Sequence, residues 1–528
     1  MINLTNTNKV EKQTSVVFDV NFDSKFPESR EISRRTGFAY GGCTSSLTNC
    51  AQKGCLQNCD REFSQASICQ MTVSTLISFS VKDSVVILHG PVGCGSQSHI
   101  IDFSIRAYGA ARGVKMEGAR WFSTNLTEAD VISGGEEKLK ATILDADKRF
   151  RPTAIFILTS CTPSIIGDDI DEVVNQLQSD VAATLVPLHC PGFKAKVFSS
   201  AYDVVYHGIL QKFKFEPIPY VDYYPFDKND KDYELKVQQY NYKKSRTVNL
   251  YNAWSIGPAD EAEIKRLLEA IGLNVQIFVE FKEPDEWRHI TEAALNVSFC
   301  HVHDVYFLEF LKQKFNMPYI LPTIPVGLGP TAKFILEIAE FFGLEEQAKK
   351  IIEKEEAKVL AALEPIKEKV RGKRVLISGG YLRIGATGLL AKELGMEVVG
   401  FRNFNYDSFG NELFSEIEEK IGDVSNSISN QPSELVNVLR KLKPDIAISH
   451  PGVGVWVTKS GIPSITLFAQ RFAFFGYRGA YDLSRRIART VSNPNYSKNL
   501  GRNVELPFKK EWYEKDPYHY IVDSNLNE

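Results

Sequence analysis

The sequence lacks the features that would place the chain in a membrane, outside the cell or on nucleic acid. None of its apolar runs reaches the about 18 residues that a membrane-spanning helix needs. The first twenty residues, MINLTNTNKVEKQTSVVFDV, contain no apolar core of a signal peptide. Basic and acidic residues number 62 and 65, and no basic stripe runs along any segment. We therefore expect a cytoplasmic protein with no membrane and no nucleic-acid partner.

Cysteine is the residue type whose distribution is most informative. Five of the nine cysteines lie between Cys43 and Cys69, and an odd number does not fit a fully paired disulfide framework. A reducing cytoplasm keeps thiols free, so clustered cysteines there are more often metal ligands or catalytic groups. Cys94, Cys161 and Cys300 each end an apolar run, a position at which thiolates can ligate iron–sulfur clusters. The alternative for each is a buried free cysteine that packs as a small apolar side chain.

The order of apolar segments predicts an α/β protein of several domains. At 528 residues the chain has room for about three or four domains of about 150 residues each. β-Branched runs such as VVILHG (85–90) alternate with amphipathic stretches such as EEKLKATILDADKRF (136–150), which is typical of parallel sheets covered by helices. The predicted boundaries are 1–68 for an N-terminal arm with a cysteine-rich insertion, 69–250, 251–372 and 373–490 for three Rossmann-like domains, and 491–528 for a C-terminal tail.

Three cysteines follow predicted strands, where parallel sheets collect their ligands. Cys94 lies in HGPVGCG, whose glycines let a bulky group approach the backbone. Cys161 follows the run AIFILTS, and Cys300 ends ALNVSFC. A nucleotide site is disfavoured, because HGPVGCG lacks the Lys-Ser/Thr end of a P-loop and SGGYLRIGATG (378–388) fits neither that pattern nor the dinucleotide fingerprint. The three positions together favour thiolate ligands.

Several motifs resemble one known family. HGPVGCG, the GG-E-EKL segment from Gly134 to Leu139 and the SC-x-x-x-IIGDDI segment from Ser160 to Ile170 are similar to the signature of nitrogenase component 1. The resemblance continues through LNVSFCH, VLISGGYLR and KPDIAIS in the same order. Overall length and the cysteine of LNVSFCH look most like the α subunit of the molybdenum–iron protein, which carries the active-site cofactor. The resemblance implies three Rossmann-like parallel-sheet domains with metal clusters between them.

The resemblance also implies cofactors and partners. Cys69, Cys94 and Cys161 would supply this chain's half of a P-cluster-like [8Fe-7S] cluster shared with a β-type subunit, and Cys300 would hold the terminal iron of a nitrogenase-type iron–sulfur cofactor. An alternative register places GFAYGG at the first cysteine, with Phe38 where the thiol should be. An α2β2 assembly and an ATP-dependent iron protein as electron donor follow from the same resemblance.

Some residues depart from the family pattern. Arg478 stands about where nitrogenase α chains have a histidine that ligates the far metal, and a guanidinium has no lone pair to replace it. Ser199 and Asp203 stand near the positions of a Gln and a His that flank the cofactor in nitrogenase. These changes argue against dinitrogen reduction, because the groups around a metal centre tune the reaction that it supports.

Histidines and an aspartate are the candidate proton donors. His99 lies on a loop that the resemblance turns toward the cofactor, and His450 ends the predicted strand PDIAIS. His301 and His303 follow Cys300 directly, so one of them could lie near the cluster. The expected function is reduction of a small molecule at a Cys300-bound cluster, with protons from His99, His450 or Asp203. The alternative is a scaffold that assembles a nitrogenase-type cofactor without turnover.

The segment 44–67 is an insertion that the resemblance does not explain. Cys43, Cys50, Cys55 and Cys59 are separated by six, four and three residues, which is neither a zinc-ribbon nor a usual ferredoxin spacing. Four thiols on this loop could bind one [4Fe-4S] cluster or one zinc ion. The alternative is a flexible loop with free thiols.

Overall fold

A computed structural model describes residues 20–54, 56, 68–96, 98–215, 231–450, 452–467 and 472–522. It contains three α/β units, each built on its own sheet. All strand pairs are parallel except one, at the edge of the third sheet. The predicted α/β class with parallel sheets is therefore confirmed.

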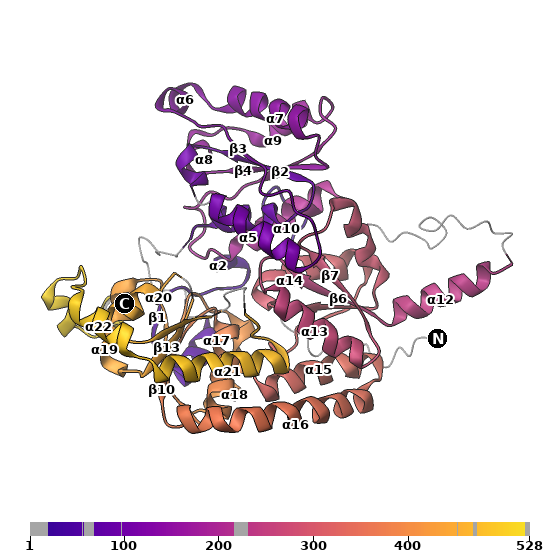
Figure 1. Ribbon diagram of the computed structural model, residues 1–528. Helices are drawn as coiled ribbons and strands as arrows, with labels where there is room; N and C mark the ends of the chain where they lie inside the picture. The colour runs from indigo at the N-terminus through magenta and orange to yellow at the C-terminus, as the bar shows by residue number, and fades with distance from the viewer. Residues whose placement is uncertain are drawn as a thin grey trace.

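The first unit forms the upper part of the molecule in Figure 1. Its central strands β2 and β4 are almost entirely buried, since helices lie on both faces, and this explains their continuous β-branched sequences. The sheet order is β3 (Trp121–Ser123), β2 (Ser84–His89), β4 (Ala154–Thr159) and β5 (Thr184–Leu188). The helices are α4 (Gln70–Phe79), α5 (Ser98–Ala111), α6 (Glu128–Ser133), α7 (Glu136–Phe150), α8 (Cys161–Ile166), α9 (Ile170–Leu177) and α10 (Ser200–Lys212).

The second unit is a smaller parallel sheet followed by long helices. Its central strand β6 (Thr247–Asn252) carries buried polar residues that no apolar pattern predicts, and the Asn249 Nδ2 donates there to the Ile290 carbonyl at 2.7 Å. The sheet order is β7 (Asn274–Val279), β6 (Thr247–Asn252), β8 (Leu295–Ser298) and β9 (Tyr319–Ile320). The helices are α12 (Tyr233–Ser245), α13 (Pro258–Ala270), α14 (His301–Phe315), α15 (Leu328–Phe342) and α16 (Glu345–Val370).

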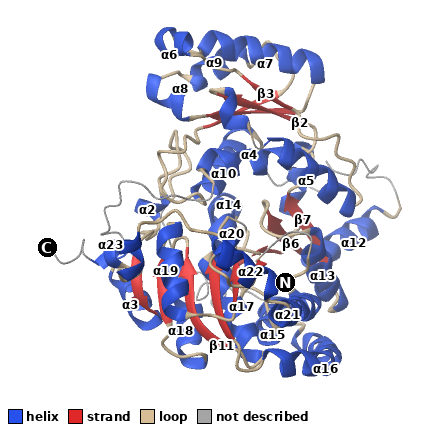
Figure 2. Cartoon of the chain, turned by 60° about the vertical axis from the view of Figure 1, so that its left-hand side comes forward, coloured by secondary structure: helices blue, strands red, loops and turns tan. Residues whose placement is uncertain are grey.

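The third unit holds the largest sheet, whose strands lie side by side in the lower part of Figure 2. The sheet order is β1 (Tyr40–Cys43), β12 (Ser425–Ile428), β11 (Glu397–Asn403), β10 (Arg374–Gly379), β13 (Ile446–Ser449) and β14 (Ser464–Thr466). The helices are α3 (Thr44–Lys53), α17 (Tyr381–Glu393), α18 (Asn411–Lys420), α19 (Pro432–Leu442), α20 (Gly454–Lys459), α21 (Gly476–Ser492), α22 (Asn495–Asn503) and α23 (His519–Val522).

The N-terminal segment is built into the units that follow it. Strand β1 pairs antiparallel with β12, so part of the segment predicted as an arm forms the edge of the third sheet. The short helix α2 (Arg30–Ser33) lies near the middle of the molecule in Figure 1. From it Arg30 reaches Asp203 on α10 of the first unit. The segment thereby connects the first and third units around the space between them.

Candidate metal centres

Three exposed thiols gather at the carboxyl edge of the first sheet. Cys94 lies in the turn Val92–Gly95 after β2, and Cys161 begins α8 directly after β4. Because His89 pairs with Thr159, the two strands end side by side. Cys69, the residue before α4, is the third thiol of the group. The three lie close enough to interact, because burial and the charges of Cys161 and Cys69 raise the pKa of the Cys94 thiol. The structure thus brings together the three cysteines expected to share a cluster.

Gly192 leaves room beside these thiols. A Cβ atom at this position would lie 3.0 Å from the Cys69 Cβ and 3.6 Å from the Cys161 Sγ. Within the described part of the chain, no three His, Cys, Asp or Glu side chains converge on a single metal ion. Three accessible thiols around bare backbone, without a carboxylate or imidazole among them, instead suit a larger iron–sulfur cluster. That donor set fits the group implied by the resemblance.

Exposed apolar side chains flank the thiols. Val92 is 55% exposed two residues before Cys94, and Phe193 is 54% exposed next to Gly192. Exposed apolar side chains that gather beside one group of residues can form part of an interface with another protein. The edge of the first sheet is therefore suited to contact another protein.

The fourth candidate ligand, Cys300, lies in a separate cleft of about 610 Å³ where the three units meet. Cys300 ends β8, precedes α14 and is only 3% exposed. The size is in the range of small-molecule and cofactor sites. Its polar and aromatic lining residues are Ser104, Tyr108, Phe198, Ser199, Tyr202, Trp254, Ser255, Cys300, His303, Tyr381, Arg383, Phe404, Asn405 and His450.

Arg383 is one of the cleft residues that the sequence did not single out. It lies on α17, just after the glycines that end β10, and forms a hydrogen bond with the Cys300 thiol. Burial raises the pKa of Cys300, and the Arg383 charge opposes that rise. A guanidinium beside a thiolate stabilises negative charge in a buried place. The glycine-rich segment 378–388, tested above for phosphate binding, was the available signal.

Of the two histidines after Cys300, His303 faces the cleft and His301 does not line it. The His303 ring stacks on Tyr202 at 3.8 Å between centroids, and its Nδ1 lies 2.5 Å from the Ser255 hydroxyl. His301 instead donates from Nε2 to the Pro322 carbonyl at 2.8 Å. The stack and the hydroxyl fix the orientation of His303 in the cleft.

Ser199 and His450 also line the cleft, as their predicted roles require. Ser199 is buried and His450 is half-buried, and neither the Ser199 hydroxyl nor the enclosed His450 Nδ1 has a hydrogen-bond partner among the described residues. Buried polar atoms of this kind normally meet a partner, so a bound group can be expected to supply it. These two atoms are the observation of this structure that best fits a cofactor in the cleft.

The other three predicted residues do not line the cleft. Asp203 is buried in ion pairs with Arg30 and Arg34, at 2.7 and 2.8 Å. His99 is exposed on α5. The Arg478 side chain is 69% exposed on α21, with its Nε 4.0 Å from Asp482. The structure therefore separates these three side chains from the Cys300 thiol.

The insertion is described only in its first half. Cys43 precedes α3 and lies 3.3 Å from the Ser46 hydroxyl, and Cys50 is half-buried on the same helix. Seven residues along an α-helix advance about 10.5 Å, so these two thiols do not converge on one ion. Cys55 and Cys59 lie outside the described residues.

No helix of the described chain has the length and apolarity needed to cross a membrane. The described residues combine three α/β units with a group of three exposed thiols and one buried thiol in a separate cleft. Comparison with known proteins identifies the class to which this combination belongs. A family model described as Nitrogenase component 1 type Oxidoreductase matches residues 69–492. The chain therefore belongs to this family, as its motifs predicted.

Relatives with two different names are similar to the chain. It is 26% identical over 435 residues to the nitrogenase molybdenum-iron protein alpha chain of Methanothermobacter thermautotrophicus, covering 79% of this chain and 86% of the relative. It is 24% identical over 510 residues to the nitrogenase iron-molybdenum cofactor biosynthesis protein NifE of Methanococcus maripaludis, covering 94% and 98%. The solved structure "Nitrogenase Cp1 at pH 5" matches with a TM-score of 0.65 at 21% identity, covering 85% of this chain and 91% of that chain, and shows a shared fold.

Proposed function

We propose that the chain is the cofactor-bearing subunit of a nitrogenase-like iron–sulfur oxidoreductase that reduces a small molecule other than dinitrogen. The observation that carries the proposal is the presence of two thiol centres with opposite environments. Cys69, Cys94 and Cys161 are exposed at a sheet edge, whereas Cys300 is buried in a cleft between the three units. A shared electron-transfer cluster needs the first environment, and a reaction centre needs the second.

The exposed thiols would hold the chain's half of a P-cluster-like [8Fe-7S] cluster. Their accessible position leaves the other side of the cluster to a β-type subunit, in an α2β2 assembly. Val92 and Phe193 are the apolar side chains available beside them for that contact. An ATP-dependent iron protein would be the electron donor to this edge of the first sheet.

The buried centre would hold a nitrogenase-type iron–sulfur cofactor through the Cys300 thiolate. When bound, such a cluster stores electrons away from water for multi-electron reduction. Arg383 would balance negative charge next to the thiolate, because its guanidinium already forms a hydrogen bond with the Cys300 thiol. Ser199 and His450 would supply polar atoms to the bound group from the other walls of the cleft.

Proton supply would come from cleft residues. His303 is held by Tyr202 and Ser255, and the Ser255 hydroxyl is placed to exchange a proton with its Nδ1. His450 faces the same cleft. The side chains of Asp203 and His99 lie outside the cleft, so protons from them would reach a bound substrate only through other residues.

A cofactor-assembly scaffold is the second candidate. Arg478 stands about where nitrogenase α chains have a histidine ligand, and its side chain lies outside the cleft, so this position supplies no second ligand to a group bound at Cys300. A cluster held by one thiolate can be released more easily than one held at both ends. The NifE relative, which is named for cofactor biosynthesis, matches along 94% of this chain.

One experiment separates the two candidates. The chain is purified anaerobically with its partner subunit, and iron, acid-labile sulfide and EPR signals are measured. Iron protein and MgATP are then added, and reduction of acetylene and of protons is followed. Turnover supports the oxidoreductase, whereas transfer of the cluster to an apo acceptor without any turnover supports the scaffold. A complex without iron and sulfide contradicts both.

A further inference from the structure

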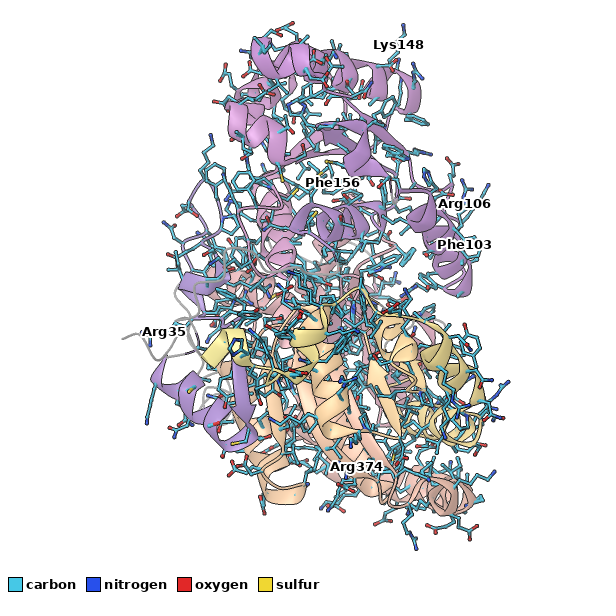
Figure 3. All side chains as sticks on the ribbon, turned by 90° about the vertical axis from the view of Figure 1, so that its left-hand side faces the viewer. Arg35, Phe103, Arg106, Lys148, Phe156 and Arg374 are labelled. Atoms are coloured by element: carbon cyan, nitrogen blue, oxygen red, sulfur yellow. The ribbon has the colours of Figure 1, made fainter. Side chains whose placement is uncertain are left out.

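A second hollow adjoins the Cys300 cleft on the outside of the molecule. It is a groove of about 560 Å³ between α5 and α13. The described residues that line it include no charged side chain, and most of them are small and apolar. Figure 3 shows Phe103 on the outer side of α5, where the side chain is 62% exposed at the rim. The residues that line the groove along the two helices are Ala107, Ala111, Pro258, Ala259 and Ala262.

The two helices are held at a fixed spacing across the groove. Arg112, directly after α5, donates from Nε to Glu261 of α13 at 2.5 Å, and both side chains are largely buried. The Arg112 guanidinium also lies 4.4 Å above the Phe281 ring. This ion pair joins the two helices at one end. The alanine side chains that face each other along the helices are too small to fill the space between them. The groove is therefore a built feature of the fold.

The groove and the cleft share a wall on α5. Ser104 and Tyr108 line both hollows. The Tyr108 ring packs against Trp254 at 5.6 Å between centroids, and Trp254 lines the cleft. Tyr108 and Trp254 therefore stand at the junction between the outer groove and the space around Cys300.

We propose that the groove between α5 and α13 is the route by which an uncharged small molecule with an apolar body reaches the Cys300 cleft. This assignment rests on the proposed function and adds the substrate class to it. An uncharged lining offers no compensation to a charged molecule, which would lose its hydration there. A molecule with a small apolar body can instead exchange water contacts for those of the alanines and Phe103.

The route is tested first without turnover. In the full-length, cluster-free chain, alkylation of Cys300 by iodoacetamide is followed by mass spectrometry, with the exposed Cys94 as internal reference. Ala262→Phe and Ala107→Phe should each slow alkylation of Cys300 about tenfold by filling the groove, and leave that of Cys94 unchanged. Ala270→Phe and Ala110→Phe make the same change at exposed positions of the same helices outside the groove and should have no effect. Equal Cys300 rates in all four variants, or no reaction of Cys300 in the unaltered chain, would overturn the route.

The second test measures substrate reduction by the cluster-containing complex. With iron protein and MgATP, the KM for acetylene should rise in Ala262→Phe while proton reduction, which needs no groove, stays unchanged. Unchanged acetylene kinetics in that variant would overturn the route even if the alkylation result held. Absence of all reduction together with groove-dependent alkylation would refute the proposed oxidoreductase and leave the route intact.

Discussion

Arg30 and Asp203 form a two-pronged ion pair in the interior of the molecule. Nε and Nη2 of Arg30 each lie 2.7 Å from one of the two carboxylate oxygens of Asp203. Arg34 adds a third contact to the same carboxylate at 2.8 Å, and the side chains are 4% exposed or less. One carboxylate of α10 thus contacts two buried guanidinium groups that precede the first sheet, and Asp407 adds a second negative charge near them. Its location identifies Asp203 as a structural centre of the fold.

Replacing Asp203 should strongly destabilise the chain. Asp203→Ala leaves two buried cations without their partner, which typically costs about 3–5 kcal/mol. The midpoint of guanidinium denaturation measures the loss. Asp145→Ala removes the exposed partner of Arg149 and should cost about 0–1 kcal/mol. Equal losses for the two variants would contradict the structural role of Asp203.

The exposed thiols should bind iron, whereas their buried neighbour Cys190 should not. Burial raises the pKa of Cys190, which lies near the charges of Cys69 and Cys161 but is fully enclosed. A neutral, enclosed thiol is a poor ligand. We expect Cys161→Ala to lower iron content and weaken co-purification with the partner subunit, and Cys190→Ala to preserve both. Iron analysis of the anaerobic complex decides, and the prediction fails if Cys190→Ala is the variant that loses iron.

Cys300 should hold a metal centre that is separate from the cluster bound by Cys94 and Cys161. Cys300→Ala removes the cleft thiol without touching the sheet edge that carries Cys94 and Cys161. We expect the EPR signal of the bridging cluster to persist while the second signal and substrate reduction disappear. Cys50→Ala, at a half-buried thiol of α3, is the matched control and should retain both signals. Full activity in Cys300→Ala would contradict the assignment of the cleft.

The pH dependence of stability should report the burial of His450. Burial, with the charges of Arg383 and Arg402, lowers the pKa of His450 to about 4 from an ordinary value of 6.5. Between these values the unfolded chain binds a proton that the folded chain does not, so stability falls as the pH decreases through this window. When the pH is lowered from about 7 to about 5, cluster-free His450→Gln should lose up to about 2 kcal/mol less stability than the unaltered chain. Identical pH profiles from denaturant titrations at each pH would refute this.

The strands and helices with regular patterns could be predicted from the sequence. The helix expected at 136–150 is α7, the apolar run at 85–90 overlaps β2 except for its first residue, and the run at 154–160 contains β4. Strand β6 could not be found in this way, because TVNLYN places asparagines inside a sheet where only the folded chain supplies their hydrogen bonds. Strand β5 was missed because Pro187 interrupts its apolar run, although a proline is tolerated near a sheet edge.

The candidate site also contains some residues whose positions could be predicted from the sequence and others whose positions could not. Cys94, Cys161 and Cys300 follow strands, and parallel strands place such residues at a common edge, so their positions could be inferred from order alone. Arg383 and Tyr202 could not, because their contacts to Cys300 and His303 join segments that are distant in the chain. Asp203 was assigned from a sequence position, whereas its environment depends on two arginines more than 160 residues earlier.

The edge strand β1 has a consequence for biosynthesis. Tyr40 pairs with Ile428, and a side chain at Gly41 would collide with the Tyr518 ring, so the first described strand packs against residues from the last part of the chain. A ribosome adds about 5–20 residues per second, so β1 has to wait until nearly the whole chain has been made before its edge is complete. During that interval its unpaired backbone groups are available to other strands. A chaperone that shields the nascent N-terminus should therefore raise the yield of folded protein.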